Sequence, residues 1–375
     1  MSSTFACIAA GGTGGHVVPG LAVAHELVAR GHDADSIVFV GSERGIETRL
    51  VPEAGFALET LPGRGIERKV SLKALLAVIG IIRGVARGVF VVRRLRPRVI
   101  VVCGGYASVP CIVGAVLWRV PMVVVARDAR AGAADRLAAR FAKASAVPFT
   151  DTDLPKAVVT GNPVRAEVLA VDRSRDRDAA RAALELPDDR VVVGVFTGSL
   201  GSRRVNDAVH GLAERWAKRS DVAIRHVIGT RDWDEVQIDL TREPLGADPE
   251  HGLVYQAVPY EDHIERLLAA SDVVVSRAGG ATVAELAVTG VPSVLVPLPI
   301  ATRDHQTFNA EALVRAGAAV RVPDAELDTD RLQHELEPLV GDPARRDRMA
   351  EAARTQGHPD AAARVADLVE EHARP

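Results

Sequence analysis

Short apolar runs alternate with longer helical patterns along residues 1–162. Buried strands of a parallel sheet are short continuous apolar runs, whereas helices repeat apolar positions every three or four residues. The expected strands are Phe5–Ala9, Ser36–Val40, Val99–Val102 and Met122–Val125, and the patterns between them include helices at Leu21–Ala29 and Ala131–Ala142. This alternation predicts a parallel sheet with helices on both faces.

The same alternation begins again beyond Gly161-Asn162-Pro163, a turn-like tripeptide that marks a domain boundary. Further strands are expected at Val191–Phe196, Ala223–Ile228, Leu253–Gln256, Val273–Val275 and Ser293–Val296, with helices at Val205–Arg219, Glu261–Ala270, Ala281–Thr289 and Gln306–Ala316. We therefore expect an α/β protein with two Rossmann-like, doubly wound domains, residues 1–162 and 163–342. A helical segment, 343–375, is expected to pack back toward the first domain. Ligands of such domains bind beyond the carboxyl ends of the strands.

Composition and charge narrow the class of protein. The chain has 375 residues, of which 47% are apolar, enough for two cores. Its net charge of −3 offers no electrostatic basis for binding nucleic acid. The three cysteines lack metal-ligand spacing, and their odd number argues against a disulfide framework, so a reducing cytoplasm is expected. No secretory signal is predicted at the N-terminus, and no apolar stretch is long enough to span a membrane.

A glycine-rich loop, Ala10-Gly11-Gly12-Thr13-Gly14-Gly15-His16, lies between the first strand and a helix expected from Pro19 to Arg30. Exposed backbone N–H groups beside a helix N-terminus suit an anion such as a diphosphate. His16 stands at the same loop, and histidine can move protons near pH 7. The loop lacks the final glycine of the dinucleotide-binding pattern, which argues against a nicotinamide enzyme. A tight turn that binds no ligand is the structural alternative.

Three more glycine turns follow later strands. Cys103–Ser108 is expected on the same rim as the first loop. The alternative is that its glycines are present only because the turn needs a positive φ. Thr197–Gly201 lies between a strand and a helix in the second half. Within Ser276–Glu285, two glycines open a helix whose N-terminus can hold a diphosphate. Glu285, about one turn in, can accept both hydroxyls of a ribose, or it is a solvated glutamate favoured by the helix dipole.

Seven motifs in this order resemble those of MurG-type glycosyltransferases of peptidoglycan synthesis: GGTGGH, CGGYASVP, GNPVR, GSLGSRRVN, SRAGGATVAEL, VPLP and DHQTFNAEAL. The resemblance implies a GT-B fold, in which two Rossmann-like domains face each other across a cleft. It implies a metal-independent enzyme without a cofactor that binds UDP-N-acetylglucosamine in its C-terminal half and lipid I in its N-terminal half. The muramoyl 4-hydroxyl would displace UDP with inversion, forming lipid II.

The resemblance also implies roles for individual residues, with His16 as the general base. The implied donor-binding residues are Thr13, Gly14, Gly15, Arg165, Ser199, Tyr260, Gly279, Gly280, Ala281, Thr282, Glu285, His305 and Gln306. The implied acceptor-binding residues are Gly14, Gly15, Gly104, Gly105, Tyr106 and Asp128, and no metal ligand is implied.

The chain departs from the family at Ala126–Gly132, where a His-Glu-Gln-Asn stretch is usual, and at Thr197, where a glycine is usual. Two alternatives therefore stay open. One is a related enzyme with another polyprenyl or secondary-metabolite acceptor. The other is a protein that binds a UDP-sugar without catalysis.

Basic residues and an amphipathic pattern coincide between residues 64 and 98, where Glu67 is the only acidic residue. Leu72, Leu75, Leu76 and Ile79 recur at helical spacing. An apolar face with basic flanks suits anionic phospholipid, and the same expectation includes Arg83 and, through the resemblance, Trp118. The alternative is that these leucines face the sheet. We expect a peripheral protein on the cytoplasmic face of a bacterial membrane.

Overall fold

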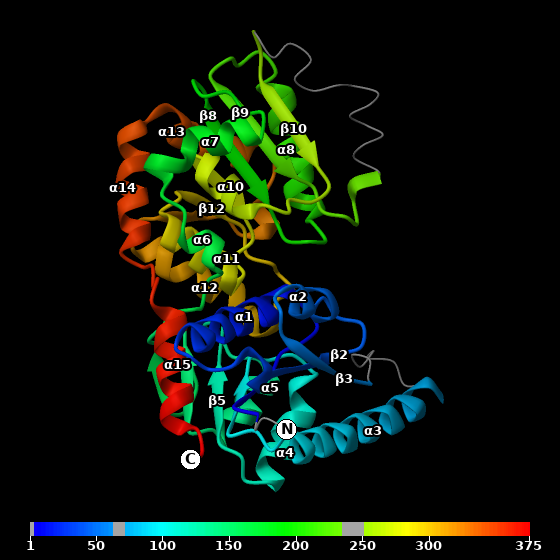
Figure 1. The fold of residues 1–375 in the computed structure, drawn as a ribbon. Coiled ribbons are helices and arrows are strands. Elements are labelled where there is room, and N and C mark those ends of the chain that lie inside the picture. Colours follow the sequence, from blue (N-terminus) through cyan, green and yellow to red (C-terminus); the bar gives the residue numbers. More distant parts are fainter. Residues whose placement is uncertain (1–3, 63–71, 235–250) are drawn as a thin grey trace. The chain divides into compact units, whose positions relative to one another are not determined.

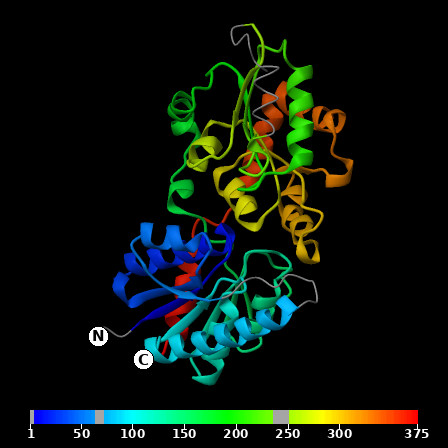
Figure 2. The ribbon, with the colours of Figure 1, turned by 90° about the vertical axis from the view of Figure 1, so that its right-hand side faces the viewer.

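The computed structural model describes residues 4–62, 72–234 and 251–375, with the side chains of the helix that begins at Leu72 described only from Arg83 onward. The predicted membrane residues Leu72, Leu75, Leu76 and Ile79 thus have side chains outside the described part. The chain forms two compact units, Met1–Arg165 with His358–Pro375, and Ala166–Gly357 (Figures 1 and 2). Each unit contains its own parallel sheet.

The first unit contains a seven-stranded sheet in the order β3-β2-β1-β4-β5-β6-β7, with every neighbouring pair parallel. Its strands are β1 (Ala6–Ala9), β2 (Ile37–Ser42), β3 (Ala57–Leu61), β4 (Val99–Val102), β5 (Met122–Val125), β6 (Ala144–Val147) and β7 (Ala157–Val159). Ile8 of β1 lies in register with Phe39 on one side and Val101 on the other, which places three apolar side chains at the centre of the sheet. The four strands predicted in this half are confirmed.

Helices cover the first sheet on both faces and enclose two apolar cores. They are α1 (Gly14–Ala29), α2 (Glu47–Glu53), α3 (Leu72–Leu95), α4 (Ser108–Leu117), α5 (Ala133–Ala139) and α15 (Ala361–His372). Val365 and Val369 of α15 share a core with Ile8 and Val23, so the end of the chain packs on the first unit (Figure 1, red beside blue).

The start of α1 differs from the expectation. The sequence predicts a helix from Pro19 to Arg30. The helix instead begins at Gly14, because Thr13 is extended and its carbonyl accepts hydrogen bonds from the N–H groups of His16 (3.0 Å) and Val17 (3.3 Å). His16 is therefore the third residue of the helix and belongs to its positive end.

The second unit contains a six-stranded parallel sheet in the order β10-β9-β8-β11-β12-β13. Its strands are β8 (Val191–Phe196), β9 (Val222–Val227), β10 (Val254–Val258), β11 (Val273–Ser276), β12 (Ser293–Leu295) and β13 (Ala319–Arg321). Its helices include α6 (Ala166–Leu169), α7 (Arg173–Ala183), α8 (Arg203–Arg215), α10 (Ile264–Ala270), α11 (Gly280–Thr289), α12 (His305–Arg315), α13 (Thr329–Gly341) and α14 (Pro343–Arg354). Because α14 belongs to this unit and α15 to the first, the helical segment expected at 343–375 is divided between them.

Both sheets have the doubly wound order that the sequence predicted. The direction in which successive strands are added reverses between β1 and β4 in the first sheet, and between β8 and β11 in the second. Loops that leave the carboxyl ends of strands at such a switch point diverge and leave room for a ligand. The glycine loops of the sequence follow these four strands.

Candidate functional site

The two glycine loops of the first unit touch each other at the switch point. A Cβ atom on Gly105 would overlap with the carbonyl oxygen of Gly11. Gly12, Gly104 and Gly105 also have φ values of +97°, +90° and +83°, which side chains disfavour. The loops share one rim, as expected, because close approach and positive φ both require glycine.

Glu47, the first residue of α2, holds the first loop from beneath. Its side chain is fully buried, and Oε1 accepts hydrogen bonds from the N–H (2.7 Å) and the hydroxyl (2.6 Å) of Ser42. The N–H of Gly12 donates to Oε1 (3.2 Å) and Oε2 (3.1 Å). No sequence motif pointed to Glu47, because only the fold brings α2 beneath the loop.

His16 is held by a side chain of the same loop. Its Nδ1 lies 2.9 Å from the Thr13 hydroxyl. Burial disfavours the imidazolium, and the Arg127 guanidinium repels it, so the pKa of His16 is lowered to about 3 despite the opposing effect of Asp128. At neutral pH the ring is therefore uncharged, which is the form that accepts a proton.

Charged side chains from the end of β5 and from α5 surround His16. The Arg127 guanidinium lies against Gly15, 3.1 Å from the position of a Cβ atom there, and it pairs with Asp128 at 3.0 Å. Asp128, predicted to bind the acceptor, is buried. Asp135 of α5 is buried near the same place, and burial raises its pKa to about 6. Sequence reasoning assigned no role to Arg127 or Asp135.

Tyr106, another predicted acceptor residue, lies at the first loop. Its ring carbon Cε1 is 3.7 Å from the position of a Cβ atom on Gly12, and its side chain is well exposed. The first rim thus brings together an aromatic surface, a histidine and backbone N–H groups.

The second unit repeats this arrangement at its own switch point. Gly198 and Gly201, after β8, have φ values of +95° and +78°. A Cβ atom on Gly201 would overlap with the Ile228 carbonyl, so this loop packs tightly on the turn after β9. The exposed Ser199, predicted to approach the donor diphosphate, is held there because its carbonyl accepts from the Thr230 N–H at 3.0 Å.

Arg277, directly after β11, ties the loops of the second rim together. Its guanidinium donates to the Ser202 hydroxyl (2.6 Å), the Val296 carbonyl (3.1 Å) and Asp324 Oδ1 (2.6 Å). One side chain therefore links the segments that follow β8, β11, β12 and β13. Arg277 lies within the motif SRAGGATVAEL, but the resemblance implies no role for it.

The N-terminus of α11 opens beside this arginine. Gly279 caps the helix in an extended conformation, and the predicted residues Ala281 and Thr282 lie half-buried in its first turn. Glu285 is only 5% exposed, so the reading of it as a solvated surface glutamate is wrong. The role of Glu285 in binding the ribose hydroxyls stays a prediction.

Two residues of α12 anchor the loop that precedes α11. Gln306 Oε1 accepts from the N–H groups of Ala278 (3.2 Å) and Leu298 (2.9 Å). Asn309 Nδ2 donates to the Ala278 carbonyl at 3.0 Å. The side-chain oxygen of Gln306 is thus a structural acceptor. Asn309, which sequence reasoning did not select, completes the anchor.

The other predicted donor residues lie at separate places. His305 is the first residue of α12, and Tyr260 follows β10 with an exposed ring. Arg165 is the last residue of the first unit. Their roles toward a donor stay predictions.

Helices α3 and α4 carry an exposed surface of aromatic and basic side chains. Phe90 of α3 is 52% exposed, and Trp118, directly after α4, is 39% exposed. The guanidinium of Arg93 lies over the Trp118 ring at 5.0 Å, and that of Arg87 lies 5.8 Å from the Phe90 ring. None of the helices in the described ranges is long and apolar enough to cross a bilayer.

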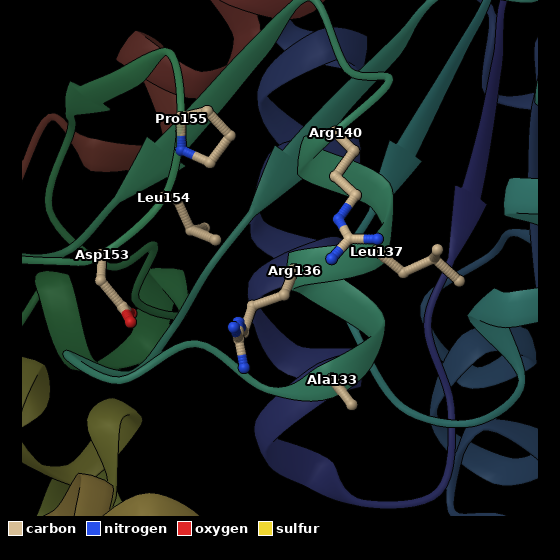
Figure 3. Close-up of a pocket in the computed structure, with 7 residues that line it drawn as sticks. All are labelled: Ala133, Arg136, Leu137, Arg140, Asp153, Leu154 and Pro155. Carbon is tan, nitrogen blue, oxygen red and sulfur yellow. The ribbon is translucent and has the colours of Figure 1, made fainter.

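A pocket of about 500 Å³ lies elsewhere on the first unit (Figure 3). Arg136 and Leu137 of α5 line it, together with Arg140 directly after the helix and with Asp153 and Leu154. None of the residues predicted from the sequence lines this pocket, so the glycine rims are the candidate site.

Comparisons with known proteins agree with this geometry. Residues 6–147 match the glycosyltransferase family 28 N-terminal domain, and residues 192–365 match the glycosyltransferase family 28 C-terminal domain. Two curated relatives are named UDP-N-acetylglucosamine–N-acetylmuramyl-(pentapeptide) pyrophosphoryl-undecaprenol N-acetylglucosamine transferase. The relative from Salinibacter ruber is 39% identical over 360 residues, covering 95% of this chain and 93% of its own. The relative from Desulforudis audaxviator is 36% identical over 368 residues, covering 97% of each chain.

Solved structures give the same result for the fold. The crystal structure of Acinetobacter baumannii MurG matches with a TM-score of 0.74 and 26% identity, over 98% of this chain and 99% of that one. CalG4, the calicheamicin glycosyltransferase, matches with a TM-score of 0.64 and 18% identity, over 99% and 98% of the two chains, which concerns the fold alone. The predicted GT-B fold class, with sheets of seven and six parallel strands, is confirmed.

Proposed function

The chain belongs to glycosyltransferase family 28, and from this premise we propose that it transfers N-acetylglucosamine from UDP-N-acetylglucosamine to lipid I, forming lipid II for peptidoglycan synthesis. The relatives from Salinibacter ruber and Desulforudis audaxviator carry the name of this reaction over nearly their full lengths. The position of His16 supports the proposal most directly, because an uncharged imidazole lies at the helix N-terminus where two glycine loops meet.

The acceptor half of the reaction is assigned to the first rim. With its proton on Nδ1, His16 donates to the Thr13 hydroxyl and presents the Nε2 lone pair to the acceptor. Nε2 takes the proton of the muramoyl 4-hydroxyl while the oxygen bonds to the anomeric carbon. The bond from that carbon to the UDP oxygen breaks, and UDP leaves with the electron pair. Gly104, Gly105, Tyr106 and Asp128 border the place assigned to the acceptor.

The donor half is assigned to the second rim. The N-terminus of α11, with Gly279, Gly280, Ala281 and Thr282, offers backbone N–H groups and a positive dipole end to the leaving diphosphate. Arg165 and Ser199 add a cation and a hydroxyl to the same task. Glu285 is assigned to the ribose hydroxyls, Tyr260 to the uracil, and His305 to the sugar. For Gln306 we assign only the Nε2 group to the sugar, because Oε1 already accepts two backbone N–H groups.

We also propose that the protein binds anionic phospholipid at the cytoplasmic face of the membrane. The surface formed by Phe90, Trp118, Arg87 and Arg93 supports this assignment, since aromatic rings and guanidinium groups favour the membrane interface. Arg83 is exposed on the same helix. Peripheral binding would bring the enzyme to a lipid-linked acceptor.

Incubation of the protein with labelled UDP-N-acetylglucosamine and a soluble lipid I analogue tests the proposal. We expect a lipid II analogue of the corresponding mass. In His16→Ala, transfer should fall by about 10²–10⁴-fold, the usual contribution of a general base, while calorimetry should show unchanged affinity for the donor. Near-normal turnover in this variant would refute the base assignment. Donor binding without transfer to lipid I, followed by transfer to another prenyl acceptor, would instead support the alternative of a different substrate.

A further inference from the structure

Asp135, the third residue of α5, is a buried carboxyl group that none of the sequence motifs includes. Its side chain is 8% exposed, and within the described parts of the chain its Oδ1 atom has no hydrogen-bond partner. Buried polar atoms of native proteins are nearly always hydrogen-bonded. An exception at the proposed active site therefore points to a function of this oxygen.

Gly104 brings Asp135 and His16 to the same small space. A Cβ atom on Gly104 would lie 2.9 Å from Asp135 Oδ1, 2.8 Å from His16 Cδ2 and 3.2 Å from His16 Nε2. The glycine, held at a φ of +90°, leaves this space without a side chain. The unpaired carboxylate oxygen and the Nε2 edge of the imidazole thus both pack against Gly104.

We propose that Asp135 is a positioning residue whose carboxylate stabilises the imidazolium of His16 during glycosyl transfer. This inference rests on the proposed function, in which His16 Nε2 takes the proton of the acceptor hydroxyl. The ring then carries a positive charge from the moment the new glycosidic bond forms until the proton passes to solvent. A carboxylate packed against the same glycine stabilises that charge in the transition state, because a buried environment screens the attraction weakly.

The other charged groups near His16 affect its charge in opposite directions. Arg127, whose guanidinium lies against Gly15, repels a positive charge on His16, and its partner Asp128 attracts it. Burial raises the pKa of Asp135 to about 6, an effect that Arg127 opposes and Asp128 reinforces. Burial together with Asp135 raises the pKa of the neighbouring Cys103 thiol to about 12, so this thiol stays neutral at physiological pH. Asp135 is therefore the group of this cluster that ionises just below neutral pH.

The dependence of kcat on pH, measured with the full-length protein, tests the inference. In the wild type, kcat for transfer to the lipid I analogue should fall below pH 6 toward the level of Asp135→Asn, because the protonated carboxyl group is uncharged like the amide. In Asp135→Asn, kcat at pH 8 should be at least fivefold lower, KM for the donor should stay within twofold, and the fall near pH 6 should disappear. Asp153→Asn, which changes an exposed carboxylate of the same unit, should keep the wild-type profile.

A spectroscopic measurement separates this inference from the proposed function. The imidazole Cε1–H signal of His16, assigned by its loss in His16→Gln, should shift with an inflection near pH 6 in the wild type and without it in Asp135→Asn. Absence of transfer by the wild type would refute the proposed function, while the signal would still show whether the two groups interact. An unchanged pH profile and an unchanged inflection in a folded Asp135→Asn protein would overturn the role of Asp135.

Discussion

Replacing Glu47 by glutamine should loosen the first glycine loop without removing any heavy atom of the side chain. The carboxylate accepts three donors: the N–H and hydroxyl of Ser42 on Oε1 and the N–H of Gly12 across both oxygens. In Glu47→Gln the amide oxygen can keep the two Ser42 bonds, but the NH2 group then faces the Gly12 N–H. Two donors then meet at a partly buried place, and the hydrogen bond from the Gly12 N–H to Oε2 is lost.

The expected loss of unfolding free energy is about 1–3 kcal/mol, the cost of replacing an acceptor by a second donor at this contact. Glu47→Ala should cost about 4–6 kcal/mol, because all these bonds are lost and a cavity opens. The loop also positions His16, two residues beyond Gly14. A displacement of the loop by about 1 Å should therefore lower kcat by roughly 10–100-fold.

Urea unfolding followed by circular dichroism, together with the transfer assay, measures both effects. Glu53→Gln is the matched control, because Glu53 lies at the other end of α2 and its side chain is 57% exposed. The control should lose less than about 0.5 kcal/mol, as expected for an exposed ion pair. A Glu47→Gln protein with the stability and kcat of the control would show that this carboxylate does not hold the loop.

Three further predictions concern the same unit. Gly104→Ala should abolish transfer, because the new methyl group would clash with the His16 ring in a backbone conformation with a φ of +90°. Gly31→Ala is the control: its φ is +98° with open space around it, so it should only lower the melting temperature. Equal kcat values in the two variants would contradict this prediction. Because the pKa of Asp135 rises from 3.8 to about 6 on folding, the folded state holds this proton more tightly and the wild type loses about 3 kcal/mol as pH rises through that window. Asp135→Asn should not show this loss. Urea unfolding should therefore find the variant more stable than the wild type at pH 8 and equally stable near pH 4. A difference in unfolding free energy that does not change with pH would refute the raised pKa of Asp135. Trp118→Glu should lower the affinity for phosphatidylglycerol vesicles, measured by co-sedimentation, at least fivefold without changing transfer to a soluble acceptor. Unchanged co-sedimentation would exclude this surface from membrane binding.

The central strands of both sheets were predictable because both of their faces are buried. Runs such as Val99–Val102 and Val191–Phe196 are continuously apolar, and the structure has strands at these bounds. The strands that were not predicted are β3, β6, β7 and β13. β3 contains Glu59 and Thr60, and β7 and β13 have only three residues each, so their membership in a sheet depends on the neighbouring strand.

The sequence by itself determined the glycine loops, the fold class and the position of His16 after the first strand. Glycine patterns are local, since a turn with positive φ needs its glycines within a few residues of one another. It did not reveal Glu47, Arg127, Asp135 or Arg277. Each of these four side chains lies against a glycine loop that is distant in the sequence, and an isolated acidic or basic residue is usually a solvated surface group.

Only the tertiary structure decided which charges the loops contain. Parallel pairing brings the carboxyl ends of β1, β2, β4 and β5 to one edge, so α1, α2 and α5, which follow β1, β2 and β5, deliver His16, Glu47 and Asp135 to the same loops. Burial at that edge then lowers the pKa of His16 to about 3 and raises that of Asp135 to about 6, because a charge removed from water is costly. A sequence records which residues can ionise, whereas the fold sets the pH at which they do.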